Sequence, residues 1–247
     1  MHHYLRGLPF PWEVLLVDDG STDRSLELLR LGSRGKPGFS VLALPHGGKP
    51  SALWAGLRRA RGEIVLFTDM DQSTPLSEWD KLAPWHGRGY DAVIGSRGAR
   101  REGFPLLRRL SGRTFRWLRR LVLLPSVSDT QCGFKSLRRR AALSVFPHLR
   151  FLRRPSPPSG WKVTAFDVEL LFLLVKAGFS IKEIEVEWRH RDLSRTKQAG
   201  RLLPRYLRES LEMAEEVLHV RLRDLLGGYR RVGLRERDPA DPHRTAR

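Results

Sequence analysis

The chain alternates short apolar runs with amphipathic segments, a pattern that predicts strands followed by helices. Mostly apolar runs predict buried strands over 13–17, 39–44, 63–68, 91–95 and 181–188. Helical spacing of apolar positions predicts helices over 23–31, 50–61, 76–85, 166–177 and 202–226. Strands that alternate with helices favour an α/β fold built on a largely parallel sheet with helices on its faces.

A strongly basic segment follows the fourth predicted strand. Nine arginines fall between Arg97 and Arg120, interleaved with leucine, phenylalanine and tryptophan. As a helix over 108–124 this segment is basic and amphipathic. Such a helix either lies in a membrane interface, with its arginines near lipid phosphates, or packs on a core as an ordinary surface helix. The pattern leaves both interpretations open.

The charge balance narrows the class of partner. The 247 residues include 45 Lys and Arg against 27 Asp and Glu, which gives a net charge of +18. Nucleic acid, an anionic membrane surface and a phosphorylated small molecule are the candidate polyanions. The hydrophobic fraction of 40% excludes a wholly disordered chain.

Three features that the sequence lacks bear on where the chain is located and on whether it forms disulfides. No apolar run approaches the roughly 20 residues of a membrane-spanning helix, and the first residues lack the apolar stretch of a secretory signal. The single cysteine, Cys132, excludes an internal disulfide and a cysteine-rich metal site. We expect a cytoplasmic chain, bound peripherally to the inner face of the membrane.

Acidic clusters follow two of the predicted strands: Asp18-Asp19 after the first, and Asp69-Met70-Asp71 after the third. Ligands of open α/β sheets bind beyond the carboxyl ends of the strands. Two carboxylates in a D-x-D arrangement offer oxygen ligands that suit Mg²⁺ or Mn²⁺, which completes its coordination with water and substrate phosphates. Gly48-Lys49 is not a P-loop, because Pro50 stands where Ser or Thr is required.

These residues belong to a series of motifs in a fixed order. The segments are VDDGSTD at 17–23, GK at 48–49, ARGE at 60–63, FTDMD at 67–71 with TP at 74–75, GSR at 95–97, SDTQCGFK at 128–135, FDVE at 166–169 and EVEW at 185–188. Together they resemble the inverting family 2 glycosyltransferases of the GT-A fold. The segment DTQCGFK is the most specific and is similar to the dolichyl-phosphate glucosyltransferase branch.

The resemblance implies transfer of a hexose, preferably glucose from UDP-glucose, to a polyprenyl phosphate, with Mg²⁺ or Mn²⁺ as cofactor. The residues it implies for nucleotide-sugar binding are Asp18, Asp19, Ser21, Lys49 and Asp69. Asp69 and Asp71 are the implied metal ligands, and catalytic roles fall on Asp71 and Asp129. The residues implied for the acceptor phosphate are Arg97, Arg108, Arg113 and Lys135.

Two of these roles are refined by the motif and by chemistry. Counting back from Asp129 places Arg108 at the family's phosphate-binding arginine, with Arg113 as second choice. A phosphate monoester is largely ionised at neutral pH, since its second pKa is about 6. It needs little help from a general base, so orientation is the alternative task for Asp129.

The resemblance implies a GT-A Rossmann-like domain over 1–197. The pattern and composition that follow predict an amphipathic helical segment over 198–229 and a charged, disordered tail over 230–247. The family begins with a further strand upstream of VDDGSTD, and we expect that strand to be missing here. His46 and Pro50 also depart from the family pattern.

Three alternatives stay open at this point. Within the class, GDP-mannose is the rival donor. Outside it, a basic nucleic-acid-binding protein would show steep salt-dependent binding, but it leaves the acidic strand ends unexplained. The third is an inactive truncated relative. We expect a nucleotide-sugar, a polyprenyl phosphate and an anionic membrane surface as partners, and no nucleic acid; the oligomeric state is not fixed by the sequence.

Overall fold

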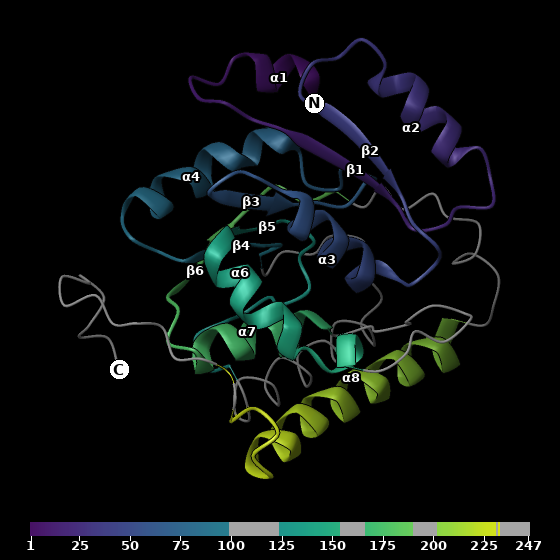
Figure 1. Ribbon diagram of the computed structural model, residues 1–247. Coiled ribbons are helices and arrows are strands. Elements are labelled where there is room, and N and C mark those ends of the chain that lie inside the picture. The colour runs from purple at the N-terminus through teal and green to yellow at the C-terminus, as the bar shows by residue number, and fades with distance from the viewer. Residues whose placement is uncertain (99–123, 154–165, 190–201, 231, 233–247) are drawn as a thin grey trace. The chain divides into compact units, whose positions relative to one another are not determined.

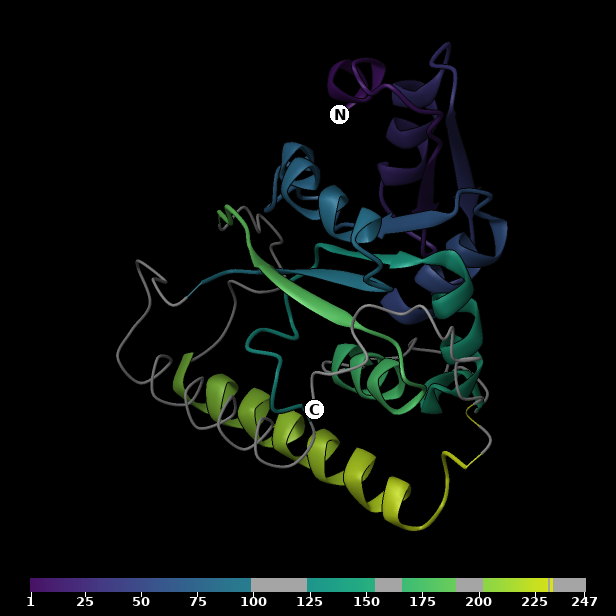
Figure 2. The same cartoon turned by 90° about the vertical axis from the view of Figure 1, so that its left-hand side faces the viewer.

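A computed structural model describes residues 1–98, 124–153, 166–189, 202–230 and 232 (Figures 1 and 2). The chain divides into two compact units. Unit 1 consists of Met1–Val65 and Leu137–Val163, and unit 2 consists of Leu66–Ser136 and Thr164–Arg247. This division cuts across the three regions expected from the sequence, and their boundaries stay a prediction.

Unit 1 carries a two-stranded parallel sheet with helices packed on it. Its elements are α1 (His2–Arg6), β1 (Val14–Asp18), α2 (Ser25–Ser33), β2 (Phe39–Ala43), α3 (Lys49–Arg59), α6 (Arg139–Val145) and two 3₁₀ turns, η2 (Phe146–His148) and η3 (Arg150–Arg153). β1 pairs with β2 in a register that sets Val14 opposite Phe39 and Asp18 opposite Ala43. The first acidic cluster therefore lies at the carboxyl end of a parallel pair.

Aromatic contacts join the parts of unit 1. Trp54 of α3 stacks on Phe146, with ring centroids 5.8 Å apart and planes 11° from parallel. Trp12 meets Phe39 edge to face at 5.8 Å. Gly38 has a φ of +85°, and a Cβ there would lie 2.7 Å from the Trp12 ring, so the turn into β2 requires glycine.

Unit 2 contains most of the second sheet and its covering helices. The elements are η1 (Leu76–Glu78), α4 (Trp79–Gly87), β4 (Ala92–Ser96), α7 (Phe166–Lys176), β6 (Ile181–Glu185) and α8 (Leu202–Leu225). With β3 (Ile64–Phe67) and β5 (Lys135–Arg138), which span the boundary of the units, the strands take the order β3-β5-β4-β6. β4 and β6 are parallel, with Ala92 opposite Ile181 and Ser96 opposite Glu185.

The core of unit 2 explains these elements. β4 is buried from Ala92 to Gly95, as expected of a central strand between two neighbours. Helix α7 is apolar on nearly every side and buried from Phe166 to Leu174, which is typical of a core helix rather than a surface one. Cys132 and Phe134 fill the same cluster as Leu82 and have no exposed surface.

The strands and helices predicted along the described chain are confirmed within a few residues at their ends. β5 and α6 were not predicted, because KSLRRR carries neither strand alternation nor an apolar stripe. The basic helix expected over 108–124 lies, but for its last residue, outside the described residues. Among the helices that are described, none is long and apolar enough to cross a membrane.

A buried polar cluster ties α8 to α7. The Tyr229 hydroxyl, after the end of α8, donates to the Glu169 carboxylate at 2.5 Å, and both side chains are almost wholly buried. The Arg223 guanidinium lies 4.0 Å from the same carboxylate and 4.9 Å from the Tyr229 ring centroid. Burial, together with the Glu169 charge, raises the pKa of the Tyr229 hydroxyl far above its ordinary value, so this group remains a donor.

Tyr229→Phe is expected to lower the free energy of unfolding by about 1–3 kcal/mol, because a buried carboxylate loses a donor that lies 2.5 Å away. Urea denaturation followed by circular dichroism measures the change. Adding Glu169→Gln to that variant removes the charge and is expected to recover part of the loss. Equal stability of Tyr229→Phe and the unmodified chain contradicts this account of the cluster.

Candidate functional site

The first acidic cluster organises the loops that follow β1 and β2 in unit 1. The buried Asp18 carboxylate accepts the Ser21 amide at 3.1 Å. The Asp19 carboxylate accepts the amides of Gly47 and Gly48 at 2.9 and 2.8 Å, one on each oxygen. One carboxylate therefore fixes the turn that leads into α3.

Two further contacts tighten this turn. Gly20 has a φ of +71°, and a Cβ there would lie 2.6 Å from the His46 amide nitrogen, so the two loops touch through their backbones. The His46 ring lies 2.9 Å from the Asp19 carboxylate. Lys49 is exposed at the start of α3, directly after these loops. The structure thus brings Asp18, Asp19, Ser21 and Lys49 into one region of unit 1.

The second acidic cluster forms a tight turn after β3. The Asp69 carbonyl accepts the Gln72 amide at 3.1 Å, and Gln72 adopts a left-handed φ of +50°. The Asp71 carboxylate accepts the Ser73 amide at 2.8 Å and is exposed, whereas Asp69 is half-buried. No group of three or more His, Cys, Asp or Glu with metal-binding geometry occurs among the described residues.

Asp69 lies directly against the DTQCGFK segment. A Cβ on Gly133 would stand 1.9 Å from one carboxylate oxygen of Asp69, far inside any permitted contact. Only glycine leaves room for the carboxylate at this point. The segment between Ser128 and Phe134, which we call the 128–134 loop, therefore borders the candidate metal ligand.

The same loop carries Asp129, which is paired with Arg97 at the end of β4. The guanidinium donates to the two carboxylate oxygens at 2.7 and 2.8 Å, and the Arg97 amide donates to one of them at 3.1 Å. A fourth donor, the Gln131 amide, lies at 3.2 Å. The side chains are 17% and 6% exposed, so this is a nearly desolvated, bidentate ion pair.

Electrostatics and packing both hold Arg97 in this position. Burial alone would lower the pKa of Arg97, but the hydrogen bonds and charge of Asp129 offset that effect and raise the pKa above its ordinary value. The guanidinium also lies 5.6 Å from the Trp188 ring centroid. Its positive charge is therefore held in a fixed orientation.

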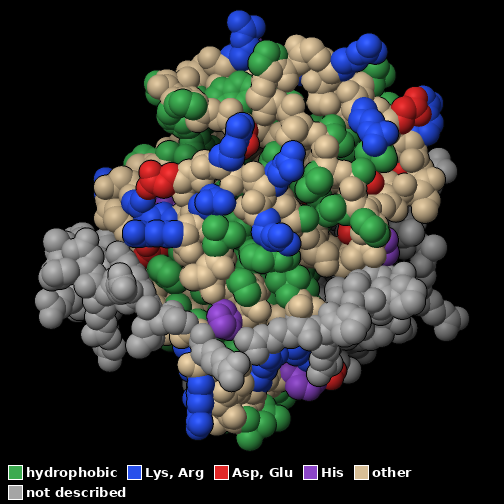
Figure 3. Space-filling model, in the orientation of Figure 1, with side chains coloured by type: hydrophobic (Ala, Val, Ile, Leu, Met, Phe, Trp, Pro, Cys, Tyr) green, Lys and Arg blue, Asp and Glu red, His purple; other side chains and the backbone are tan. Residues whose placement is uncertain are grey.

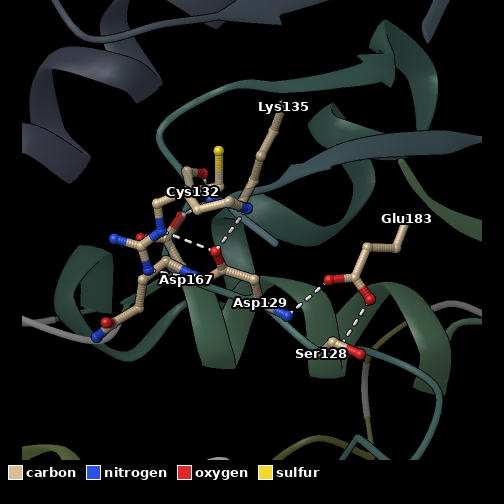
Figure 4. Close-up of polar contacts among 8 residues, drawn as sticks. Ser128, Asp129, Cys132, Lys135, Asp167 and Glu183 are labelled. Atoms are coloured by element: carbon tan, nitrogen blue, oxygen red, sulfur yellow. Dashed lines mark hydrogen bonds and ion pairs between the residues drawn. The ribbon is translucent and has the colours of Figure 1, made fainter. Parts of the chain in front are cut away.

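Two carboxylates outside the loop hold its ends (Figure 4). Glu183 of β6 accepts the Ser128 and Asp129 amides at 2.6 and 2.7 Å. At the other end the Lys135 ammonium, which has no exposed surface, pairs with Asp167 of α7 at 2.6 Å and donates to the Cys132 carbonyl. Between them, burial raises the pKa of the Cys132 thiol.

The structure thus places three of the predicted residues of unit 2, Asp69, Arg97 and Asp129, at one loop. Arg97 and Asp129 contact each other, and Asp69 contacts Gly133 of the same loop. Lys135 points into the core with its charge paired, so its proposed role toward an acceptor phosphate stays a prediction. Arg108 and Arg113 lie outside the described residues.

Sequence reasoning missed two of the residues that shape this site. Glu183 lies in a strand of mixed pattern, IKEIE, and no motif marks it. Asp167 belongs to the FDVE motif, but its partner Lys135 is 32 residues away, and only the fold shows that they meet.

Comparison with known proteins places this geometry in a family. The model of the family described as "Glycosyl transferase family 2" matches residues 3–146. The chain belongs to this family. The resemblance expected from the motifs is therefore confirmed, and the DxD turn and the whole 128–134 loop fall inside the matched region.

Within the glycosyl transferase family 2, the chain is similar to curated dolichyl-phosphate beta-glucosyltransferases. The dolichyl-phosphate beta-glucosyltransferase of Drosophila melanogaster is 33% identical over 246 residues, which cover 93% of this chain and 69% of the relative. That of Mus musculus is 33% identical over 236 residues, covering 90% of this chain and 67% of the relative. The chain spans 57% to 69% of the length of the curated relatives it matches.

Solved structures confirm the expected GT-A type of α/β fold. Glucosyl-3-phosphoglycerate synthase from Mycobacterium tuberculosis, solved with Mn²⁺, uridine diphosphate and glucosyl-3-phosphoglycerate, has a TM-score of 0.52 at 22% identity, covering 87% of this chain and 69% of that one. Mannosyl-3-phosphoglycerate synthase from Rubrobacter xylanophilus has a TM-score of 0.51 at 18% identity, covering 100% and 73%. At these identities the likeness establishes the fold alone.

Gly133→Ala is expected to weaken Mn²⁺ binding in the presence of UDP-glucose by roughly tenfold or more. The new Cβ displaces the Asp69 carboxylate by much more than the roughly 0.2 Å that metal–ligand distances tolerate. Isothermal titration calorimetry measures the affinity. Gly87→Ala is the control, because a Cβ there meets nothing within 4 Å. Unchanged Mn²⁺ affinity in Gly133→Ala would contradict the prediction that Asp69 is a metal ligand.

Proposed function

We propose that the chain is an inverting glycosyltransferase that moves glucose from UDP-glucose to a polyprenyl or dolichyl phosphate with the help of a divalent cation. The observation that carries the proposal is the 128–134 loop, which borders the carboxylate of Asp69 on one side and the fixed guanidinium of Arg97 on the other. The names of the curated relatives support glucose as the sugar and dolichyl phosphate as the acceptor.

The donor side of the site fits a divalent cation. Asp69 and Asp71 offer only carboxylate oxygens, the ligands that Mg²⁺ and Mn²⁺ prefer, and Gly133 leaves the space that the Asp69 carboxylate needs. When bound, the ion supplies positive charge that stabilises the leaving nucleoside diphosphate. In unit 1, Asp18, Asp19, Ser21 and Lys49 are the residues we assign to the nucleotide-sugar; Lys49 adds a positive charge and Asp19 shapes the loop before it.

The acceptor side uses the Arg97–Asp129 pair. A lipid phosphate is already anionic at neutral pH, so its oxygen attacks the anomeric carbon without loss of a proton to the protein. The new carbon–oxygen bond forms on the face opposite the leaving diphosphate, which inverts the anomeric centre. Because four donors hold the Asp129 carboxylate, we assign Asp129 the task of orienting Arg97 toward the phosphate. Arg108 and Arg113 remain further candidates for phosphate contact.

A lipid acceptor requires access to a membrane surface, and α8 offers a suitable face. Leu218, Leu222, Leu225 and Leu226 recur at helical spacing and are 54% to 76% exposed, while Val217 and Val220 on the opposite side are buried. Hydrophobic and basic side chains reach the surface together at the lower edge of Figure 3, where Figure 1 places the end of α8. The chain has a net charge of +18, which favours contact with anionic lipids. We therefore propose that it binds peripherally to an anionic membrane at the cytoplasmic face.

Radiolabelled sugar transfer to a polyprenyl phosphate tests the function, with UDP-glucose and GDP-mannose as donors and with Mn²⁺ or EDTA. We expect transfer from UDP-glucose that EDTA abolishes. Asp71→Ala is expected to reduce the rate at least about a hundredfold, since it removes a proposed metal ligand itself and not a residue that only supports a ligand.

Asp80→Ala, on the exposed surface of α4, is the control and is expected to retain the unmodified rate. Transfer from GDP-mannose alone would correct the sugar. Absence of transfer from both donors by a folded chain would refute the lipid acceptor.

Replacing the exposed Leu218 and Leu222 by Gln is expected to weaken binding to vesicles of anionic phospholipid by roughly tenfold or more, because each leucine contributes about 1.5–3 kcal/mol when it inserts fully into the apolar layer. Vesicle co-sedimentation measures the change. The matched control replaces Leu28 and Leu31 of α2, which are 56% and 64% exposed. Equal effects of the two double variants would show that α8 is not the membrane-binding face.

A further inference from the structure

Glu183 makes a contact that the proposed reaction does not yet use. This residue lies in β6, and each oxygen of its carboxylate accepts one backbone amide, that of Ser128 at 2.6 Å and that of Asp129 at 2.7 Å. Hydrogen bonds to an ionised acceptor are shorter and about twice as strong as neutral ones. The carboxylate therefore clamps two consecutive amides at the start of the 128–134 loop (Figure 4).

The strand that carries Glu183 also sets the position of Arg97. β6 runs parallel to β4, with Ser96 opposite Glu185, and the Val186 amide donates to the Ser96 carbonyl at 2.9 Å. Arg97 follows Ser96 directly. Arg97 follows β4, and Glu183, which holds the loop, lies in the neighbouring strand β6. The pairing of these two strands therefore fixes the position of Asp129 relative to Arg97.

Hydrogen-bond chemistry makes a carboxylate necessary at this position. Both partners of Glu183 are N–H donors, so both of its terminal atoms must accept. The amide of glutamine keeps the shape but replaces one acceptor by an N–H₂ group, which sets a donor against a donor. One of the two loop amides then loses its partner, and the loop is free to shift at Asp129.

We propose that Glu183 is the positioning residue of the acceptor site: its carboxylate holds the Ser128 and Asp129 amides so that Asp129 presents the Arg97 guanidinium to the acceptor phosphate. Its catalytic consequence rests on the function proposed above, whereas its effect on the loop does not. Glu183 touches no reacting atom, and it acts through Asp129 alone.

The single cysteine reports directly on this loop. Cys132 lies within the loop and has no exposed surface, and the chain contains no other thiol. Its rate of labelling by a thiol reagent such as dithionitrobenzoate therefore measures how often the loop opens, whether or not the chain is active. In Glu183→Gln we expect this rate to rise at least about tenfold, with a thermal midpoint close to that of the unmodified chain.

Steady-state kinetics test the catalytic consequence. Glu183→Gln is expected to lower kcat/KM for the polyprenyl phosphate by roughly tenfold, with a smaller change in KM for UDP-glucose. Glu183 holds the Asp129 end of the loop, whereas the Lys135–Asp167 pair holds the end next to Gly133. Glu187→Gln is the control: Glu187 is 47% exposed and pairs with Arg189 at the surface, so neither the labelling rate nor the kinetics should change.

The Cys132 labelling rate tests the proposal directly. An unchanged rate in a folded Glu183→Gln chain overturns the proposal, and so does an equal rise of the rate in Glu187→Gln. If the unmodified chain transfers no glucose, the proposed function fails and the labelling rate still tests the clamp. If Glu183→Gln does not fold, hydrogen exchange in the unmodified chain decides: protection of the Ser128 and Asp129 amides equal to that of Val186 supports the clamp, and unprotected exchange overturns it.

Discussion

The ion pair between Arg97 and Asp129 is the interaction on which the rest of the site depends. Two opposite charges that are nearly out of water stabilise a structure only when their geometry is good and their other hydrogen-bonding positions are filled. Both conditions hold, because two further amides complete the Asp129 carboxylate. Replacing either side chain would remove the ion-pair partner of a nearly buried charge. The pair therefore links the end of β4 to the 128–134 loop.

This constraint couples the two sides of the proposed reaction. The loop that presents Asp129 to Arg97 continues to Gly133, where the absence of a side chain admits the Asp69 carboxylate. It then ends at Lys135, whose buried ammonium is neutralised by Asp167. Carboxylates from β6 and α7 fix the loop at both ends and so hold the Arg97 guanidinium and the Asp69 carboxylate in one rigid arrangement. Preorganisation of this kind is what a transfer reaction between two anionic substrates needs.

The sequence predicted the parts of the site that depend on local pattern. Strand ends followed by acidic residues, the DxD turn and the DTQCGFK segment were all recognisable, and the family match confirms the resemblance built on them. The sequence could not predict contacts between segments that lie far apart along the chain. Glu183 sits in a strand without a motif, and it matters because of the register between β6 and β4. The sequence alone suggested that the Lys135 charge is available to a ligand. Only the structure shows that the side chain is buried and forms an ion pair with Asp167.

A crystal structure of the chain with Mn²⁺, UDP-glucose and a short-chain polyprenyl phosphate tests the central claim most directly. The account predicts the metal on the carboxylates of Asp69 and Asp71 beside Gly133, and the acceptor phosphate on the Arg97 guanidinium with the Asp129 pair intact. A metal bound by other residues, or a phosphate held away from the 128–134 loop, would contradict it.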